Sequence, residues 1–250
     1  MNHLLLRVVV LGLLIWPFLA AGQTLRLYTE HFPPYNFVYQ GRVVGTNTDI
    51  VLRACAMANL DCKVSLYPWR RAFDMTLADK QSGLYTTAMT AQRSSQFQWV
   101  GPLASSRSYL YRLKRRPEVN PANLDQAKTF GIAVAAGDIY EDYFVQLGFV
   151  RGKNLLDFPT KSAPIAMFLQ GKVDLVVGSE QVMPTWLAAH GAGMQDVEQV
   201  FELNLPGNNY LALNNAVPVT QVQALQQAID QLRSSGEYQQ LVEKTQPNWK

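Results

Sequence analysis

Apolar and polar residues alternate along the chain in a pattern that predicts two α/β units. In the first unit, period-two alternation at 24–29 and short apolar runs at 62–67 and 84–89 predict strands. Segments with helical spacing at 46–57 and 69–79 lie between these strands and predict helices. This alternating order implies one sheet with helices packed on its faces.

A second unit of the same kind follows in the middle of the chain. Strands are expected at 129–137, which ends in a glycine, and at 173–179. Helices are expected at 138–148, at 161–171 and around 183–190. The second unit is therefore also predicted to be α/β.

Two similar apolar strands, near 107–113 and 208–214, connect the two units. Because the chain leaves the first unit, builds the second and returns, we expect one lobe from 23–108 plus 212–250 and the other from 109–211. Paired crossovers of this kind permit hinge bending around a cleft between the lobes.

The front of the chain is predicted to be an export signal. Residues 1–22 contain one strong charge, Arg7, followed by an apolar run at 8–19 and small residues at 20–22. The run is shorter than the roughly 20 residues of a membrane span. We expect cleavage near Gly22 and a periplasmic protein, with an uncleaved membrane anchor as the alternative.

Composition excludes several classes of protein. The chain has 22 Lys and Arg against 19 Asp and Glu, a balance too small and too scattered for a nucleic-acid binder. None of the three histidines has metal-ligand spacing, and neither a G-x-S-x-G motif nor a P-loop occurs. We therefore expect no cofactor, no metal and no catalytic residues, and we also expect a monomer.

The predicted export of the chain determines the expected state of its two cysteines, Cys55 and Cys62. An oxidising environment favours a disulfide between them. The alternative is two separate buried thiols, since free cysteine packs as a small apolar residue.

Several segments, taken in order, resemble the family 3 periplasmic solute-binding proteins, the polar-amino-acid group that serves ABC importers. The segments that carry the resemblance are PPYNF, GRVVGTNTDIV, TAQRSSQFQWVGPL, AVAAGDIYEDYF, GKVDLVV and SSGEYQQLVEKTQPNW. The resemblance covers essentially the whole mature chain. It implies a two-lobed, type II periplasmic-binding-protein-like fold, with a mixed sheet flanked by helices in each lobe and two hinge crossovers. The cysteine spacing also matches a disulfide of the members that bind basic amino acids.

The resemblance implies an anion site around Arg93. The family's arginine at this position clamps the α-carboxylate of the ligand, and a guanidinium is suited to bidentate binding of that group. Backbone N–H groups near Thr87 and Thr90 would complete the site. A surface arginine paired with a local acid is the alternative.

Aromatic and further basic residues fall where the family sandwiches its ligand. Phe32, Tyr35 and Trp69 are the aromatic candidates, although each could instead belong to the core. Arg70 or Arg71 could add a second cation, but adjacent helix residues point about 100° apart, so only one of them can face the cleft.

Two departures from the family leave the ligand open. Where members that bind amino acids place an aspartate for the ligand ammonium, this chain has Ser179 followed by Glu180. Asp138 stands where the family offers Thr or Ser to the ligand carboxylate. It would either cap a helix or face the cleft and attract a cation.

The expected function is capture of a small polar solute, an amino acid or a related carboxylate or amine, for an ABC importer. One alternative is a periplasmic enzyme of the same fold resembling cyclohexadienyl dehydratase, with Glu180 as its general acid. Another is a sensing protein that docks to a membrane receptor.

Overall fold

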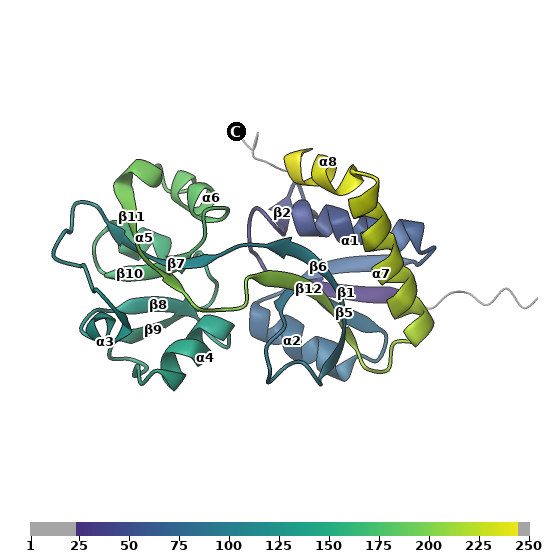
Figure 1. The fold of residues 1–250 in the computed structure, drawn as a ribbon, viewed down its shortest axis with the longest axis horizontal. Coiled ribbons are helices and arrows are strands. Elements are labelled where there is room, and N and C mark those ends of the chain that lie inside the picture. The colour runs from purple at the N-terminus through teal and green to yellow at the C-terminus, as the bar shows by residue number, and fades with distance from the viewer. Residues whose placement is uncertain (1–23, 245–250) are drawn as a thin grey trace, which may run out of the picture.

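Two five-stranded sheets with helices packed against them form the two lobes of the computed structural model, which describes residues 24–244 (Figure 1). The predicted signal peptide, residues 1–22, lies outside the described residues. Within 24–244, no helix combines the length and the apolar character needed to cross a membrane. The predicted two-lobed α/β architecture is confirmed.

The sheet of the first lobe has the strand order β4-β1-β5-β12-β6. Its strands are β1 (Leu25–Thr29), β4 (Cys62–Leu66), β5 (Ser82–Ala88), β6 (Phe97–Ser105) and β12 (Asn208–Asn214). Strands β4, β1 and β5 are parallel, whereas β12 runs antiparallel between β5 and β6. The helices are α1 (Thr46–Met57), α2 (Trp69–Ala78), α7 (Val219–Ser234) and α8 (Glu237–Lys244), and a hairpin of β2 (Phe37–Tyr39) and β3 (Arg42–Val44) precedes α1.

Alternation along β1 explains how this sheet is covered. Leu25 and Leu27 belong to one buried cluster with residues of α1 and α7, while Tyr28 belongs to another with residues of α2. Successive side chains of a strand point to opposite faces, so helices pack on both sides of the sheet.

The sheet of the second lobe has the order β11-β7-β10-β8-β9. Its strands are β7 (Ser108–Leu113), β8 (Ile132–Ala135), β9 (Leu155–Phe158), β10 (Leu175–Gly178) and β11 (Val197–Leu203). Strands β10, β8 and β9 are parallel, and β7 is antiparallel to β10 and β11. The helices are α3 (Leu124–Ala127), α4 (Ile139–Gln146), α5 (Ile165–Leu169) and α6 (Met183–Ala188), with a 3₁₀ turn at Met194–Asp196.

The chain passes between the sheets at 106–107 and again at 204–207, and Figure 1 shows these two connections side by side. The first passage lies close to the predicted boundary after 108. The predicted boundary after 211 falls inside β12, all of which belongs to the first sheet. The sheet assignment therefore moves that boundary to 204–207.

The second lobe departs from the predicted elements in one place that matters for function. The helix predicted at 161–171 is α5, which begins only at Ile165, after Pro164. Proline fixes its own backbone and favours the first helical turn. Residues 159–164 therefore form a loop between β9 and α5.

Cys55 in α1 and Cys62 in β4 form the predicted disulfide, with an S–S distance of 2.10 Å. We expect the Cys55→Ala, Cys62→Ala variant to lose ~2.5 kcal/mol of unfolding free energy, because the bond closes a short loop and restricts the unfolded chain. Urea denaturation measures this loss. Wild-type protein under reducing conditions should lose a similar amount, and unchanged stability in both samples would refute the prediction.

Asp79, just after α2, accepts hydrogen bonds from Arg26 Nε and Nη2 at 2.5 Å and from Tyr28 Oη at 2.9 Å. The Arg26 guanidinium lowers the pKa of Asp79 to about 2. This folded-state pKa lies below the ordinary value of 3.8. The ionised Asp79 therefore stabilises the folded protein above pH 4, and this contribution is lost as pH falls through 2.

We therefore expect Asp79→Asn to lower the unfolding free energy by about 1 kcal/mol at pH 7, a modest value because Arg26 is half exposed. The difference from wild type should vanish near pH 2. Urea titrations at both pH values measure it, with the exposed Asp230→Asn as control. A difference that persists at pH 2 would show that the ion pair is not its cause.

Candidate functional site

A hollow at the junction of the two lobes, here called the cleft, is lined by residues from both sheets and both connections. In the first lobe, the ends of β1 and β5 and the start of α2 surround it, and in the second lobe the loops after β8 and β9 do. The carboxyl ends of parallel strands are the common place for ligand sites in open α/β sheets. The cleft is closed, with a volume of about 30 Å³. It is lined by Phe32, Trp69, Thr86, Ala88, Arg93, Ser106, Ser108, Asp138, Ile139, Tyr140, Lys161, Pro206, Gly207 and Asn209.

The loop after β1 is held against the start of α1. Phe32 N donates to Asn36 O at 2.7 Å, and Asn36 Nδ2 donates to the carbonyl of Glu30 at 2.6 Å. Asn47 N, in the first turn of α1, donates to Tyr35 O at 3.0 Å. Gly45 permits this approach, because it has a φ of 124° and a Cβ there would lie 2.4 Å from Tyr35 O. These bonds place Glu30 and Phe32 at the cleft.

Arg93 is a buried cation in the first lobe. Its guanidinium lies 5.1 Å from the ring centroid of Trp69, and Nη2 lies 3.5 Å from the carbonyl oxygen of Gly137. The residue is 7% exposed, and burial lowers the pKa of its guanidinium. Among residues 24–244, no carboxylate lies within ion-pair distance of Arg93. A buried guanidinium of this kind is suited to an incoming carboxylate.

Trp69, the first residue of α2, joins the two lobes directly. Its Nε1 donates a hydrogen bond of 2.8 Å to the carbonyl of Gly137 in the second lobe. Gly137 has a φ of 74°, which allows the chain to turn sharply between β8 and α4. The indole therefore serves both as a wall of the cleft and as a contact that holds the lobes together.

Lys161, from the loop between β9 and α5, enters the cleft from the second lobe. Its Nζ forms an ion pair with Glu30 of the first lobe and lies 3.2 Å from Asp138 Oδ2. The ammonium also lies 4.7 Å from the ring centroid of Phe32 and 5.3 Å from that of Trp69. Burial lowers the pKa of Lys161, but the carboxylates of Asp138 and Glu30 more than offset this, so its pKa lies above the ordinary value.

Asp138 fills both of the roles that its sequence position suggested. Its Oδ1 accepts a 2.7 Å hydrogen bond from Ile139 N and caps α4, while Oδ2 faces Lys161 in the cleft. Glu30 is 2% exposed, and its Oε2 is buried with no hydrogen-bond partner in the described part of the chain. Burial raises the pKa of the Glu30 carboxyl.

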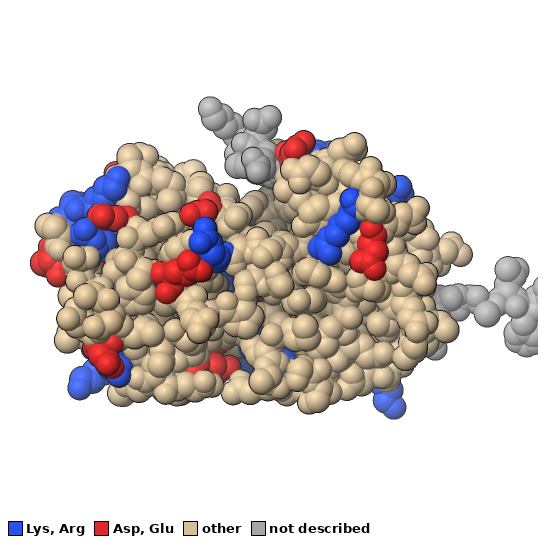
Figure 2. All heavy atoms as spheres, in the orientation of Figure 1, with Lys and Arg blue, Asp and Glu red and all other residues tan. Residues whose placement is uncertain are grey.

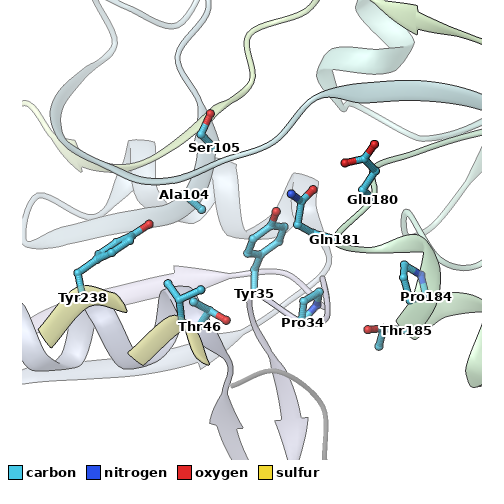
Figure 3. A pocket seen from close by; sticks show the side chains of 11 residues that line it. Pro34, Tyr35, Thr46, Ala104, Ser105, Glu180, Gln181, Pro184, Thr185 and Tyr238 are labelled. Carbon is cyan, nitrogen blue, oxygen red and sulfur yellow. The ribbon is translucent and has the colours of Figure 1, made fainter. Parts of the chain in front are cut away.

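Tyr35 and Glu180, both predicted for the ligand site, line a different cavity. This side hollow, of about 450 Å³, lies between the lobes beside the first connection and reaches α8 at Tyr238 and Val242. Figure 3 shows Tyr35 at its centre and Glu180 on its second-lobe side. Glu180 lies 3.4 Å from Gln199 Nε2, a long contact. Glu180, the predicted general acid of the dehydratase alternative, is thus not among the residues that line the cleft.

The other polar residues predicted for the site lie at different places, and one of them, Arg71, has its guanidinium 4.6 Å from the ring centroid of Tyr67. Thr87 turns its hydroxyl to the carbonyl of Leu84 at 3.1 Å, whereas Thr90 Oγ1 is buried with no described hydrogen-bond partner. Ser179 lies between β10 and α6, with its Oγ 3.4 Å from Val182 N. Arg70 pairs with Asp74 at 3.1 Å on the surface, at the outer edge of the cleft. Lys161 is a further cation of the cleft, which the sequence did not indicate.

Sequence reasoning missed Glu30 and Lys161, although a signal for Glu30 was present. Glu30 directly follows β1, so the strand-end rule could have placed it at the cleft. The sequence did not indicate Lys161, because this residue was expected to begin a helix and not to lie in the loop that follows a strand. Within the described residues, no group of three or more His, Cys, Asp or Glu is placed to hold a metal ion.

Charges on the outer surface are mixed in sign. Figure 2 shows basic and acidic side chains next to one another on the face in view, separated by wide uncharged areas. The ion pairs of the structure include Arg53 with Glu237 and Arg112 with Glu198. The buried charges of the cleft are therefore a separate feature from the surface charge.

Comparison with known proteins identifies relatives of both the sequence and the fold. The sequence pattern of the bacterial extracellular solute-binding proteins, family 3, matches residues 25–246. No curated protein sequence matches the chain.

Several solved structures share the fold. An ancestral arginine-binding protein bound to arginine is 18% identical with a TM-score of 0.77, and covers 90% of this chain and 98% of its own. A histidine kinase sensor domain similar to periplasmic binding proteins is 17% identical with a TM-score of 0.80, covering 90% and 96%. An amino acid ABC transporter substrate-binding protein from Streptococcus pneumoniae, bound to L-arginine, is 16% identical with a TM-score of 0.74, covering 89% and 94%.

Proposed function

The chain belongs to the bacterial extracellular solute-binding proteins, family 3, and from that premise we propose that it captures a small amino acid in the cleft between its lobes. The observation that carries the proposal is the buried guanidinium of Arg93, which lacks a carboxylate partner among the described residues. The ligand carboxylate binds Arg93 through charge-assisted hydrogen bonds. Similar folds bound to arginine, in the ancestral protein and the S. pneumoniae protein, support an amino acid as the ligand.

In this chain the ligand ammonium is bound by other residues than the aspartate that the family uses. Ser179 cannot neutralise an ammonium, but two buried carboxylates are near: Asp138 lines the cleft, and Glu30 is paired with Lys161, which also lines it. The free Oε2 of Glu30 provides the acceptor. The rings of Phe32 and Trp69 then cover the apolar part of the ligand.

Lobe movement provides entry and release. A cleft of about 30 Å³ does not hold an amino acid, so the lobes separate about the connections at 106–107 and 204–207 before the ligand enters. Closure buries the ligand and brings Trp69 back to Gly137. We propose that this closed form, outside the cytoplasm, delivers the ligand to an ABC importer.

A thermal-shift screen of amino acids, polyamines, small carboxylates and oligopeptides tests the proposal. An amino acid at 100 times its Kd should stabilise the protein by about 2.7 kcal/mol, an easily measured rise in Tm. Stabilisation by polyamines alone would show that no carboxylate is recognised and would overturn the proposal.

The importer role has a separate test. Uptake of the labelled ligand by cells should fall when the gene is deleted and recover when it is restored. Unchanged uptake, combined with binding in vitro, would favour docking to a membrane receptor instead.

A further inference from the structure

We infer that Lys161 occupies the part of the cleft where a cationic side chain of an amino acid would lie, and so selects small amino acids of zero net charge against arginine and lysine. The inference rests on the proposed function and deepens it by naming the class of ligand.

The surroundings of the Lys161 ammonium are those that bind an organic cation. Its Nζ lies near two aromatic ring centroids, 4.7 Å from that of Phe32 and 5.3 Å from that of Trp69. It is also paired with Glu30 across the cleft and lies 3.2 Å from Asp138 Oδ2. Aromatic faces combined with carboxylates attract alkylammonium and guanidinium groups. In this protein the chain itself supplies that group.

The buried charges of the cleft indicate which net charge a bound ligand should have. Glu30 and Asp138 carry two negative charges and Lys161 one positive charge, which leaves an excess of one negative charge. Arg93 provides a positive charge without a carboxylate of its own. With Arg93 included, the four buried charges cancel, and a zwitterion that places its carboxylate on Arg93 and its ammonium at the acidic pair keeps the whole site neutral.

A cationic amino acid would upset this balance. Arginine or lysine would add a second positive charge beside Lys161, and a buried charge without a partner is costly. At the outer edge, Arg70 and Asp142 have opposite charges and do not change the count. Binding of a cationic side chain therefore requires Lys161 to leave the site.

The small volume of the cleft favours the same class of ligand. The Lys161 side chain is only 9% exposed and fills the region between the lobes. The remaining 30 Å³ would hold about two water molecules, at 10–15 Å³ each. Small ligands therefore require the least separation of the lobes.

Titration calorimetry with glycine, L-alanine, L-serine, L-arginine and L-lysine tests the inference on the wild type and on Lys161→Ala. The wild type should bind a small neutral amino acid at least about 10-fold more tightly than arginine or lysine. In Lys161→Ala, the affinity for arginine relative to that ligand should rise about 10-fold or more. Lys153→Ala, which removes an exposed lysine of the same lobe, should behave as the wild type.

Either of two results would overturn the role of Lys161. One is a wild type that binds arginine or lysine as tightly as the small amino acids, and the other is a ratio that Lys161→Ala leaves unchanged. If Lys161→Ala does not fold, Lys161→Gln removes the charge while keeping a hydrogen-bond donor for Glu30, and the same shift is expected. Amino-acid binding with an unchanged ratio refutes this inference alone, whereas absence of any amino-acid binding refutes the proposed function.

Discussion

Arg93→Gln should weaken binding of the amino acid by roughly 100-fold or more, equivalent to about 2.7 kcal/mol. The guanidinium is buried and has no ion-pair partner among the described residues, so the ligand carboxylate would lose its only buried cation that is free to pair with it. A carboxylate left buried without its partner costs about 3–5 kcal/mol. The variant should fold, because glutamine keeps a polar head and no intramolecular ion pair is lost. Calorimetric titration measures the loss.

Two further variants separate charge from geometry. Arg93→Lys keeps the charge but not the planar fork, so it should recover only part of the affinity. Arg53→Gln removes an exposed arginine that pairs with Glu237, and it should leave binding unchanged. If Arg93→Gln binds as tightly as the wild type, the carboxylate does not lie at Arg93.

Trp69→Ala should weaken binding by roughly 30-fold, or about 2 kcal/mol, because Trp69 is a buried aromatic residue at the centre of the lobe contact. The change removes the hydrogen bond to Gly137 and the ring that lies beside Arg93 and Lys161. The affinity is measured by titration, and the degree of closure of the ligand-bound protein is measured by small-angle X-ray scattering.

Trp69→Phe is the matched control, because it keeps an aromatic ring but loses the N–H donor, together with a smaller part of the ring area than Trp69→Ala removes. It should weaken binding by about fivefold, since one hydrogen bond contributes about 1 kcal/mol. Equal effects of both variants would assign the whole role of Trp69 to its hydrogen bond. A loss below about threefold in Trp69→Ala, within about 0.7 kcal/mol, would contradict the contact between the lobes as a source of affinity.

Local sequence patterns were sufficient to predict most elements of the first lobe and to predict that the chain forms two lobes. The strand at 24–29, the helices at 46–57 and 69–79 and the strand at 62–67 correspond to β1, α1, α2 and β4 within two residues at each end. These elements have regular alternation or helical spacing, and packing in the fold reinforces both. The resemblance to the family indicated Arg93, Trp69 and Phe32 for the cleft, and in the structure all three follow the ends of parallel strands and line it.

The acidic and basic partners in the cleft could not be found in the same way. Glu30 and Lys161 are separated by 131 positions, and only the closure of one lobe on the other brings them together. Hydrophobic periodicity carries no information on such a pairing, since neither residue belongs to a helix or strand. Glu180 was misplaced for a related reason. It lies in the turn between β10 and α6, and this turn directs it to the side hollow.

The central claim, that the cleft holds an amino acid by its carboxylate at Arg93, is tested most directly by one calorimetric cycle. The wild type and Arg93→Gln are each titrated with the best-binding amino acid and with its α-carboxamide, which keeps the ammonium and the side chain but has no carboxylate. The wild type should bind the acid roughly 100-fold more tightly than the amide, and Arg93→Gln should bind the two within about threefold of each other. A wild type that binds acid and amide equally would contradict the claim.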